Sequence, residues 1–280
     1  MKAINDLIRK NPVLSYFVLT FLISWGAILV LIAFNGMPAT TAEANAQLLV
    51  AIVAMLGGPL ISGLLMIGLV DGRPGYRALL ARLCKWRVGW QWYAVALLTA
   101  PAVFLPVQFT LSLFSPAYQF GFLGPDGASL AIMAIISGIM VGICEEIGWF
   151  GFAIPKMRLR FTPLATGLII GLLWGLWHIM ANDIWAIKTY SGDIPVVLYA
   201  VLTGLSYLIG QLPPFRILMV WAYERTGSLL LMVVMHFSLT ACSISFASQT
   251  ASGWQVFIYS LSIAAAFWLL AGVVVRAKKL

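Results

Sequence analysis

Charged and titratable residues are scarce in this sequence. Only 9% of its 280 residues are charged; nine residues are acidic, and there are three cysteines and two histidines, His178 and His236. Soluble domains carry about 25% charged residues, so this composition excludes a soluble globular domain. The few cysteines exclude a disulfide-stabilised scaffold, and the apolar composition excludes a disordered chain. Chemistry that moves protons or binds metals must therefore rely on few residues.

Long apolar runs dominate the sequence instead. Hydrophobic residues make up 62% of the chain, and the mean hydropathy is +0.98. A helix needs roughly 20 apolar residues to cross a bilayer, and eight runs meet that need. The runs lie at 12–34, 46–70, 92–115, 128–154, 163–182, 194–213, 227–248 and 253–275. The sequence therefore predicts an all-α polytopic membrane helix bundle of about eight transmembrane helices. The first run exceeds the roughly 7–15 residues of a signal-peptide core, so we expect it to be retained.

The cations support this helix count. Cytoplasmic loops of membrane proteins are enriched in Lys and Arg, and a cytoplasmic N-terminus leaves only Lys188 on the outer side. The predicted cytoplasmic cations are Lys2, Arg9, Lys10, Arg73, Arg77, Arg82, Lys85, Arg87, Lys156, Arg158, Arg160, Arg216, Arg225, Arg276, Lys278 and Lys279. We expect both termini to be cytoplasmic, in a bacterial plasma membrane. The net charge of +8 then reflects contact with anionic lipid head groups, and no nucleic acid is expected as a partner.

Four ionisable residues lie deep within the predicted spans. Glu145 and Glu146 are in the fourth span, His178 in the fifth and His236 in the seventh. At about 1.5 Å per residue, all lie roughly 14–22 Å from the cytoplasmic end of their helices. An ionisable residue at this depth costs roughly 2.5–3.5 kcal/mol on insertion scales. Polar residues also join membrane helices, but an acid pair and both histidines at one level favour a functional site.

Two stripes of small residues at four-residue spacing lead up to this level. They comprise Ala134, Gly138 and Gly142 before Glu146, and Gly167, Gly171 and Gly175 before His178. Small residues allow two membrane helices to approach closely. We expect the stripes to pack the fourth and fifth helices together near Glu146 and His178. On the seventh helix, Thr240 lies on the same face as His236.

These residue types allow several kinds of chemistry. A carboxylate and an imidazole can activate water as a nucleophile, while a second histidine and a hydroxyl stabilise an oxyanion. Glu145, His178 and His236 could alternatively hold a catalytic zinc ion with one open position. A Glu and His cluster within a membrane also serves as a proton relay in transporters. The residues alone leave these readings open.

Three motifs resemble those of the CPBP family, the CAAX prenyl protease and bacteriocin-processing intramembrane proteases, also called the ABI family. The first runs from Glu145 to Phe152, with Pro155, Lys156 and Met157 after it. The second runs from Trp174 to His178, and the third from His236 to Thr240. Order and spacing agree over roughly residues 128–248. The resemblance divides the chain into three N-terminal helices (1–127), a catalytic core (128–248), and a last helix with a basic tail (249–280).

The resemblance implies an intramembrane endopeptidase. Glu145 with His178 would activate the attacking water, Glu146 would support the site, and His236 would stabilise the oxyanion with Thr240 as an auxiliary group. The substrate would be a membrane-associated protein or a peptide; prenyl-protease members act on prenylated substrates at the cytosolic side. The motifs do not decide whether the family depends on a metal: zinc is compatible with them, and we favour activation of water by glutamate and histidine.

Two positions depart from the family pattern. Phe150 replaces an arginine that usually follows the second glutamate by four residues, and Thr240 replaces an Asn or Asp. Loss of the arginine removes a cation that could orient a carboxylate, and threonine is a shorter, differently aimed hydrogen-bond donor. The alternative hypothesis is therefore a non-catalytic member that acts in bacteriocin immunity or binding.

Overall fold

Helices form almost the whole of the computed structural model, which describes residues 6, 8–124, 126–246 and 251–278, and these residues form no strand. The α-helices are α2 (Pro12–Asn35), α3 (Thr41–Met66), α4 (Gly72–Leu83), α5 (Trp90–Leu98), α6 (Pro101–Ser112), α7 (Gly127–Gly148), α8 (Ile154–Met157), α9 (Pro163–Ile179), α10 (Val196–Leu205), α11 (Leu212–Thr226), α12 (Leu229–Phe246) and α13 (Trp254–Lys278). The π-helical turns are η1 (Ile67–Asp71), η4 (Trp149–Ala153), η5 (Met180–Trp185) and η7 (Ser206–Gln211), and the 3₁₀ turns are η2 (Pro116–Tyr118), η3 (Gly121–Leu123) and η6 (Ile187–Thr189).

The predicted fold class is confirmed. Among the described residues, eight continuous helical segments are long and apolar enough to cross a membrane. They are Pro12–Asn35, Thr41–Leu83, Trp90–Ser112, Gly127–Met157, Pro163–Trp185, Val196–Thr226, Leu229–Phe246 and Trp254–Ala277. Each overlaps one predicted run, so the protein is an all-α integral membrane protein. The predicted division between 248 and 249 lies outside the described residues.

The predicted end of the sixth span is wrong. Pro213 and Pro214 were expected to end that helix near residue 213, yet the helical segment continues to Thr226 through α11. The two prolines lie in the first turn of α11, directly after the π-helical turn η7, and the carbonyl of Ile209, four residues before Pro213, accepts a hydrogen bond from the Trp268 indole instead. Arg216 therefore lies inside a helix and is fully buried, whereas the sequence placed it in a cytoplasmic loop.

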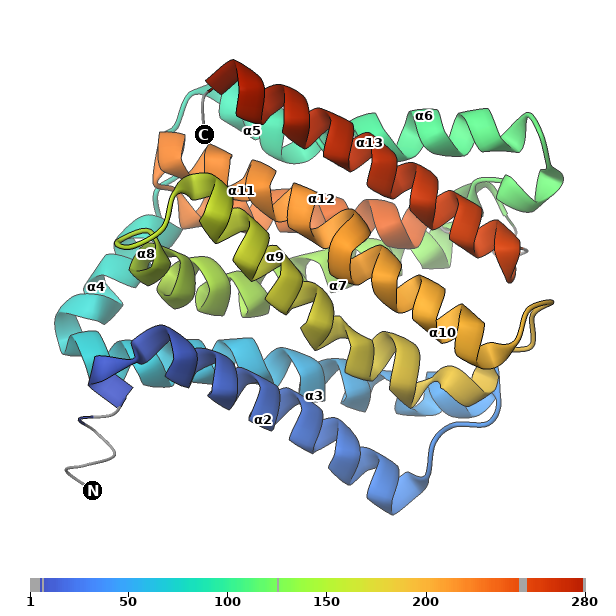
Figure 1. Ribbon diagram of the computed structural model, residues 1–280, viewed down its shortest axis with the longest axis horizontal. Helices are drawn as coiled ribbons and strands as arrows, with labels where there is room; N and C mark the ends of the chain where they lie inside the picture. Colours follow the sequence, from blue (N-terminus) through green and yellow to red (C-terminus); the bar gives the residue numbers. More distant parts are fainter. Residues whose placement is uncertain (1–5, 7, 125, 247–250, 279–280) are drawn as a thin grey trace.

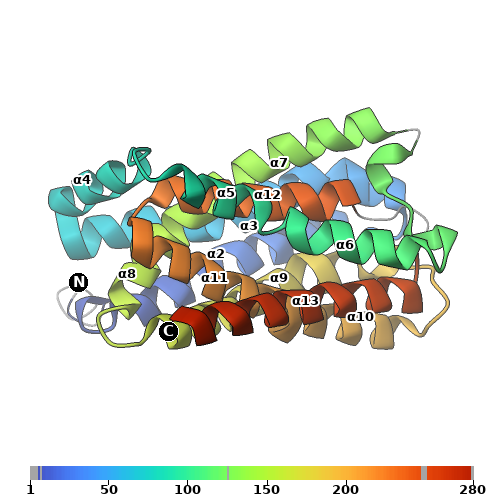
Figure 2. The same cartoon turned by 90° about the horizontal axis from the view of Figure 1, so that it is seen from above.

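The other basic segments gather at one end of the bundle, here called the basic end. The start of α2, the helices α4 and α8, and the end of α13 lie there in both views (Figures 1 and 2). Lys156 of α8 pairs with Asp71 at 2.5 Å, and Arg158 pairs with Glu224 at 3.0 Å. These contacts join three segments that are far apart in the sequence. Lys2 and Lys279 lie outside the described residues.

The two stripes of small residues each pack against a helix other than the predicted one. A side chain at Gly138 or Gly142 would collide with Phe237 or Val233, so the first stripe packs α7 against α12. A side chain at Gly167, Gly171 or Gly175 would collide with the backbone of Ile217, Pro213 or Leu208, so the second stripe packs α9 against α11 and η7. The predicted packing of one stripe on the other is therefore wrong, and four helices rather than two surround the acid pair.

Candidate active site

A cavity of about 290 Å³ lies at the centre of the bundle. Glu145 of α7, His178 of α9, and His236 and Thr240 of α12 all line it. The rest of the wall is mostly apolar and includes Leu56, Phe104, Trp174, Trp177, Leu212 and Leu239. Four of the five residues predicted for the site therefore face one cavity. The fifth, Glu146, is fully buried behind its wall.

Glu145 is held by two neutral donors. Its Oε2 atom accepts hydrogen bonds from the Trp174 indole at 2.7 Å and the Trp149 indole at 3.1 Å. Trp149 is four residues further along the helix and therefore lies on the same face as Glu145. Indole N–H groups are donors only, so they orient the carboxylate without neutralising its charge. The carboxylate of Glu145 is thus fixed in position and forms no ion pair with any residue that the structure describes.

Glu146 has a charged environment. Its Oε2 is 2.9 Å from the guanidinium of Arg216 and its Oε1 is 2.5 Å from Nδ1 of His236. All three side chains are at most 2% exposed. An isolated buried charge is costly in an apolar medium, whereas a buried pair with further hydrogen bonds offsets that cost. Glu146 therefore joins α7 to α11 and α12 and fixes the ring of His236.

The hydrogen bond of His178 sets its tautomer. Nδ1 lies 2.9 Å from the backbone carbonyl of Trp174, one turn earlier in α9. A carbonyl only accepts, so Nδ1 donates and carries the hydrogen; Nε2 of the neutral ring then keeps its lone pair. The ring also contacts Trp177 edge to face at 4.8 Å between centroids. His178 is thus held as a ring whose Nε2 can accept a proton.

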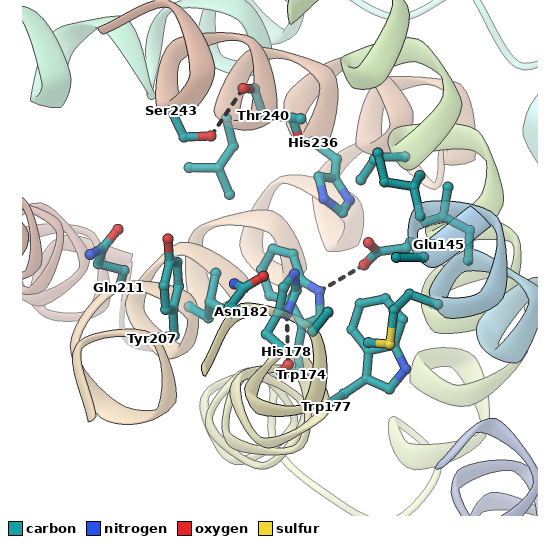
Figure 3. Close-up of a pocket in the computed structure, with 18 of the residues that line it drawn as sticks. Glu145, Trp174, Trp177, His178, Asn182, Tyr207, Gln211, His236, Thr240 and Ser243 are labelled. Atoms are coloured by element: carbon teal, nitrogen blue, oxygen red, sulfur yellow. Dashed lines mark hydrogen bonds between the residues drawn. The ribbon is translucent and has the colours of Figure 1, made fainter. Parts of the chain in front are cut away.

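The cavity has a polar side opposite the glutamate. Figure 3 shows Glu145 and His236 on one side, and Tyr207 and Gln211 on the other. The Tyr207 ring lies parallel to the ring of His178, with 6.2 Å between centroids. Ser243 donates to the backbone carbonyl of Thr240 at 2.9 Å, and both line the cavity. Hydrogen-bonding groups are therefore spread along the cavity as well as at the glutamate.

Arg216 contacts the site through Glu146, although the sequence predicted it only as a loop cation. Its guanidinium lies 4.0 Å above the Trp174 ring and 5.5 Å from the ring of Phe150. A cation therefore lies beside Phe150, the position where the first motif usually has its arginine, but it comes from α11. A signal was present in the sequence, because an apolar run at 217–222 directly follows this arginine. The adjacent prolines masked that signal.

Arg82 was predicted only as a loop cation and also supports the site. It donates from α4 to the carbonyls of Phe150 and Gly151, at 3.1 and 2.8 Å, and to the Tyr223 hydroxyl at 2.9 Å. Phe150 and Gly151 lie in the π-helical turn η4, directly after the acid pair. A π-turn disrupts the regular α-helical hydrogen bonds, and such turns often occur at functional sites. Arg82 thus anchors the end of the helix that carries both glutamates.

The predicted zinc ligands do not fit a metal site in this arrangement. Within the described part of the chain, no group of three His, Cys, Asp or Glu side chains comes close enough to hold a metal ion. Oε2 of Glu145 faces two indole N–H groups, which repel a cation. The donor set is therefore arranged for hydrogen bonding.

Comparison with known proteins identifies the part of the chain that holds this site. Residues 127–242 match the profile of a family described as type II CAAX prenyl endopeptidase Rce1-like. This match supports the predicted resemblance to the CPBP family. A protein of Methanococcus maripaludis described as CAAX prenyl protease 2 is 22% identical over 147 residues, which are 51% of this chain and 52% of the relative. The chain thus spans about half the length of that relative. The matched segment holds α7, α9, α11 and most of α12, which supply both glutamates, Arg216 and both histidines.

Proposed function

We propose that this protein is an intramembrane endopeptidase in which Glu145 and His178 activate a water molecule for attack on a peptide bond. The observation that supports this most is the different environment of the two glutamates. Glu145 faces the cavity with neutral partners, and Glu146 is neutralised behind the wall. A carboxylate without an ion pair in an apolar cavity is suited to accept a proton from water. The match of residues 127–242 to a CAAX protease family supports the same reaction class.

The proposed reaction follows from these positions. The water oxygen bonds to the peptide carbonyl carbon as its proton passes to Glu145, and Nε2 of His178 accepts a hydrogen bond from that water. His236 carries a hydrogen on both ring nitrogens: Nδ1 donates to Glu146, and Nε2 donates to the developing oxyanion. Thr240 provides an auxiliary hydroxyl. When the tetrahedral intermediate breaks its C–N bond, Glu145 returns the proton to the leaving amine. The cycle needs no metal or organic cofactor.

The proposed substrate is a membrane-associated protein or a peptide, prenylated or not. Most of the cavity wall is apolar and can hold hydrophobic side chains. Asn182, Gln211, Thr240 and Ser243 supply polar groups for a peptide backbone. We place the protein in a plasma membrane with its basic end, and therefore both termini, in the cytoplasm.

Peptide cleavage by the purified protein in proteoliposomes tests this proposal. A library of fluorescent apolar peptides is incubated with the wild-type protein and with a Glu145→Ala/His178→Ala variant, and products are identified by mass spectrometry. We expect cleavage by the wild type alone, unchanged by a metal chelator. Equal cleavage by the variant would refute the mechanism. Loss of activity with the chelator, restored by zinc, would refute the metal-free cycle.

A further inference from the structure

The residues that line the cavity are not evenly exposed along it. Glu145, Trp174, Trp177 and His236 are buried, while Leu48, Asn182 and Ser243 are exposed. Leu48 is seven residues from the start of α3, and Asn182 and Ser243 are each three residues from the end of their helical segments. At about 1.5 Å per residue, these exposed residues lie within roughly 5–10 Å of those helix ends. They come from three helices and mark the mouth of the cavity.

All three of these helix ends lie away from the basic end. The segments that hold Asn182 and Ser243 begin at the basic end, with Pro163 and Leu229, and finish at the opposite one; α3 runs the other way and reaches η1 and α4 at the basic end (Figure 1). The mouth residues therefore lie on the same side of the bundle as Lys188.

A closed layer separates the cavity from the basic end. Trp149, Phe150 and Arg216 are fully buried, and Tyr223 packs on Phe150 with 5.0 Å between ring centroids. Arg82 is hydrogen-bonded to the same layer from the basic side. A peptide that approached from the basic end would have to break the ion pair between Glu146 and Arg216 to reach Glu145.

We infer that the cavity opens toward the membrane face opposite the basic loops, and that substrate peptides reach Glu145 from that face. Cytoplasmic loops carry the excess of Lys and Arg, so this is the non-cytoplasmic face. The inference about substrate rests on the proposed peptidase function and narrows it to exported or membrane-anchored polypeptides whose cleavable segment lies on that face. This differs from the cytosolic processing expected from the family resemblance.

The direction of the mouth is measurable without any cleavage activity. A Ser243→Cys/Cys84→Ser variant is exposed, in cells, to a membrane-impermeant maleimide that adds a large mass tag, and the same variant is labelled in inverted membrane vesicles. Cys84 of the wild-type chain is exposed at the end of α4, at the basic end, and serves as the matched reference. Asn182→Cys in the same background gives a second position at the mouth.

We expect at least fivefold faster labelling of the cysteine at 243 from outside intact cells than from inverted vesicles, with the reverse ratio for Cys84. The cysteine at 182 should behave as that at 243, which covers failure of one variant to fold. Labelling of both mouth positions only from the side that labels Cys84, or from neither side, would overturn the inference. If the labelling is as expected but no library peptide is cleaved, the proposed peptidase function fails while the direction of the cavity stands.

Discussion

The adjacent residues Glu145 and Glu146 lie on different sides of α7 and have opposite electrostatic environments. On the cavity side, Glu145 receives two indole N–H groups and keeps its charge unpaired. On the side that faces away from the cavity, here called the sealed side, Glu146 contacts Arg216 and His236. The residues are adjacent in the sequence and about 100° apart around the helix, and that rotation places them in different environments. Under the proposed function, Glu145 provides chemistry and Glu146 provides structure.

Removing the charge of Glu146 should have the largest effect on the free energy of unfolding, and it tests the structural role of the sealed side. A Glu146→Gln change leaves Arg216 buried without its carboxylate, which costs about 3–5 kcal/mol in free energy of unfolding. Denaturant titration of the purified protein in detergent measures this loss. A Glu146→Leu/Arg216→Met variant removes both members of this ion pair and should recover part of the stability, because replacing a buried pair with apolar residues is often neutral and only the Nδ1 contact of His236 is then lost. A double variant as unstable as Glu146→Gln would show that the pair is not the cause.

On the cavity side, Trp174→Phe removes the shorter hydrogen bond to Glu145 while keeping an aromatic ring against Arg216. A hydrogen bond to a charged group contributes about 1.5–3 kcal/mol, so we expect kcat to fall roughly 10- to 150-fold. Steady-state kinetics with a cleaved peptide measure this change, with KM as the internal control. A tenfold rise in KM at unchanged kcat would instead assign Trp174 to substrate binding.

Of the substitutions predicted to change the cleavage rate, the one at Thr240 should have the smallest effect. Thr240→Val keeps the side-chain shape and removes one hydroxyl, which is worth about 0.5–1.5 kcal/mol and so about 2- to 10-fold in kcat. Peptide cleavage measured beside Trp174→Phe gives the ranking of the two. Complete loss of activity in a folded Thr240→Val protein would move this hydroxyl from an auxiliary role to an essential one.

The sequence predicted the helical spans well, because these depend on local chemistry. Apolar runs of sufficient length defined eight spans, and the rarity of ionisable residues inside them singled out Glu145, Glu146, His178 and His236. Glu145 and Trp149 are four residues apart, so helical periodicity also accounts for the hydrogen bond between them.

The choice of helix partners could not be predicted in the same way. Small residues indicate that another helix packs closely against them, but they do not identify that helix. The stripe before His178 packs on α11, and this contact carries Arg216 into the centre of the bundle. The sequence did not show this contact, so Arg216 was predicted as a loop cation. The structure places the guanidinium of Arg216 beside the ring of Phe150, the residue that replaces the usual arginine.

The most direct test of the account is a comparison of Glu145→Gln with Glu146→Gln in one cleavage assay and one unfolding titration. We predict that Glu145→Gln unfolds within about 1 kcal/mol of the wild type, because its indole partners can still donate to the amide oxygen, yet cleaves peptide about 100- to 10,000-fold more slowly through loss of the general base. Glu146→Gln should lose stability instead. Wild-type cleavage by a folded Glu145→Gln protein would contradict the account.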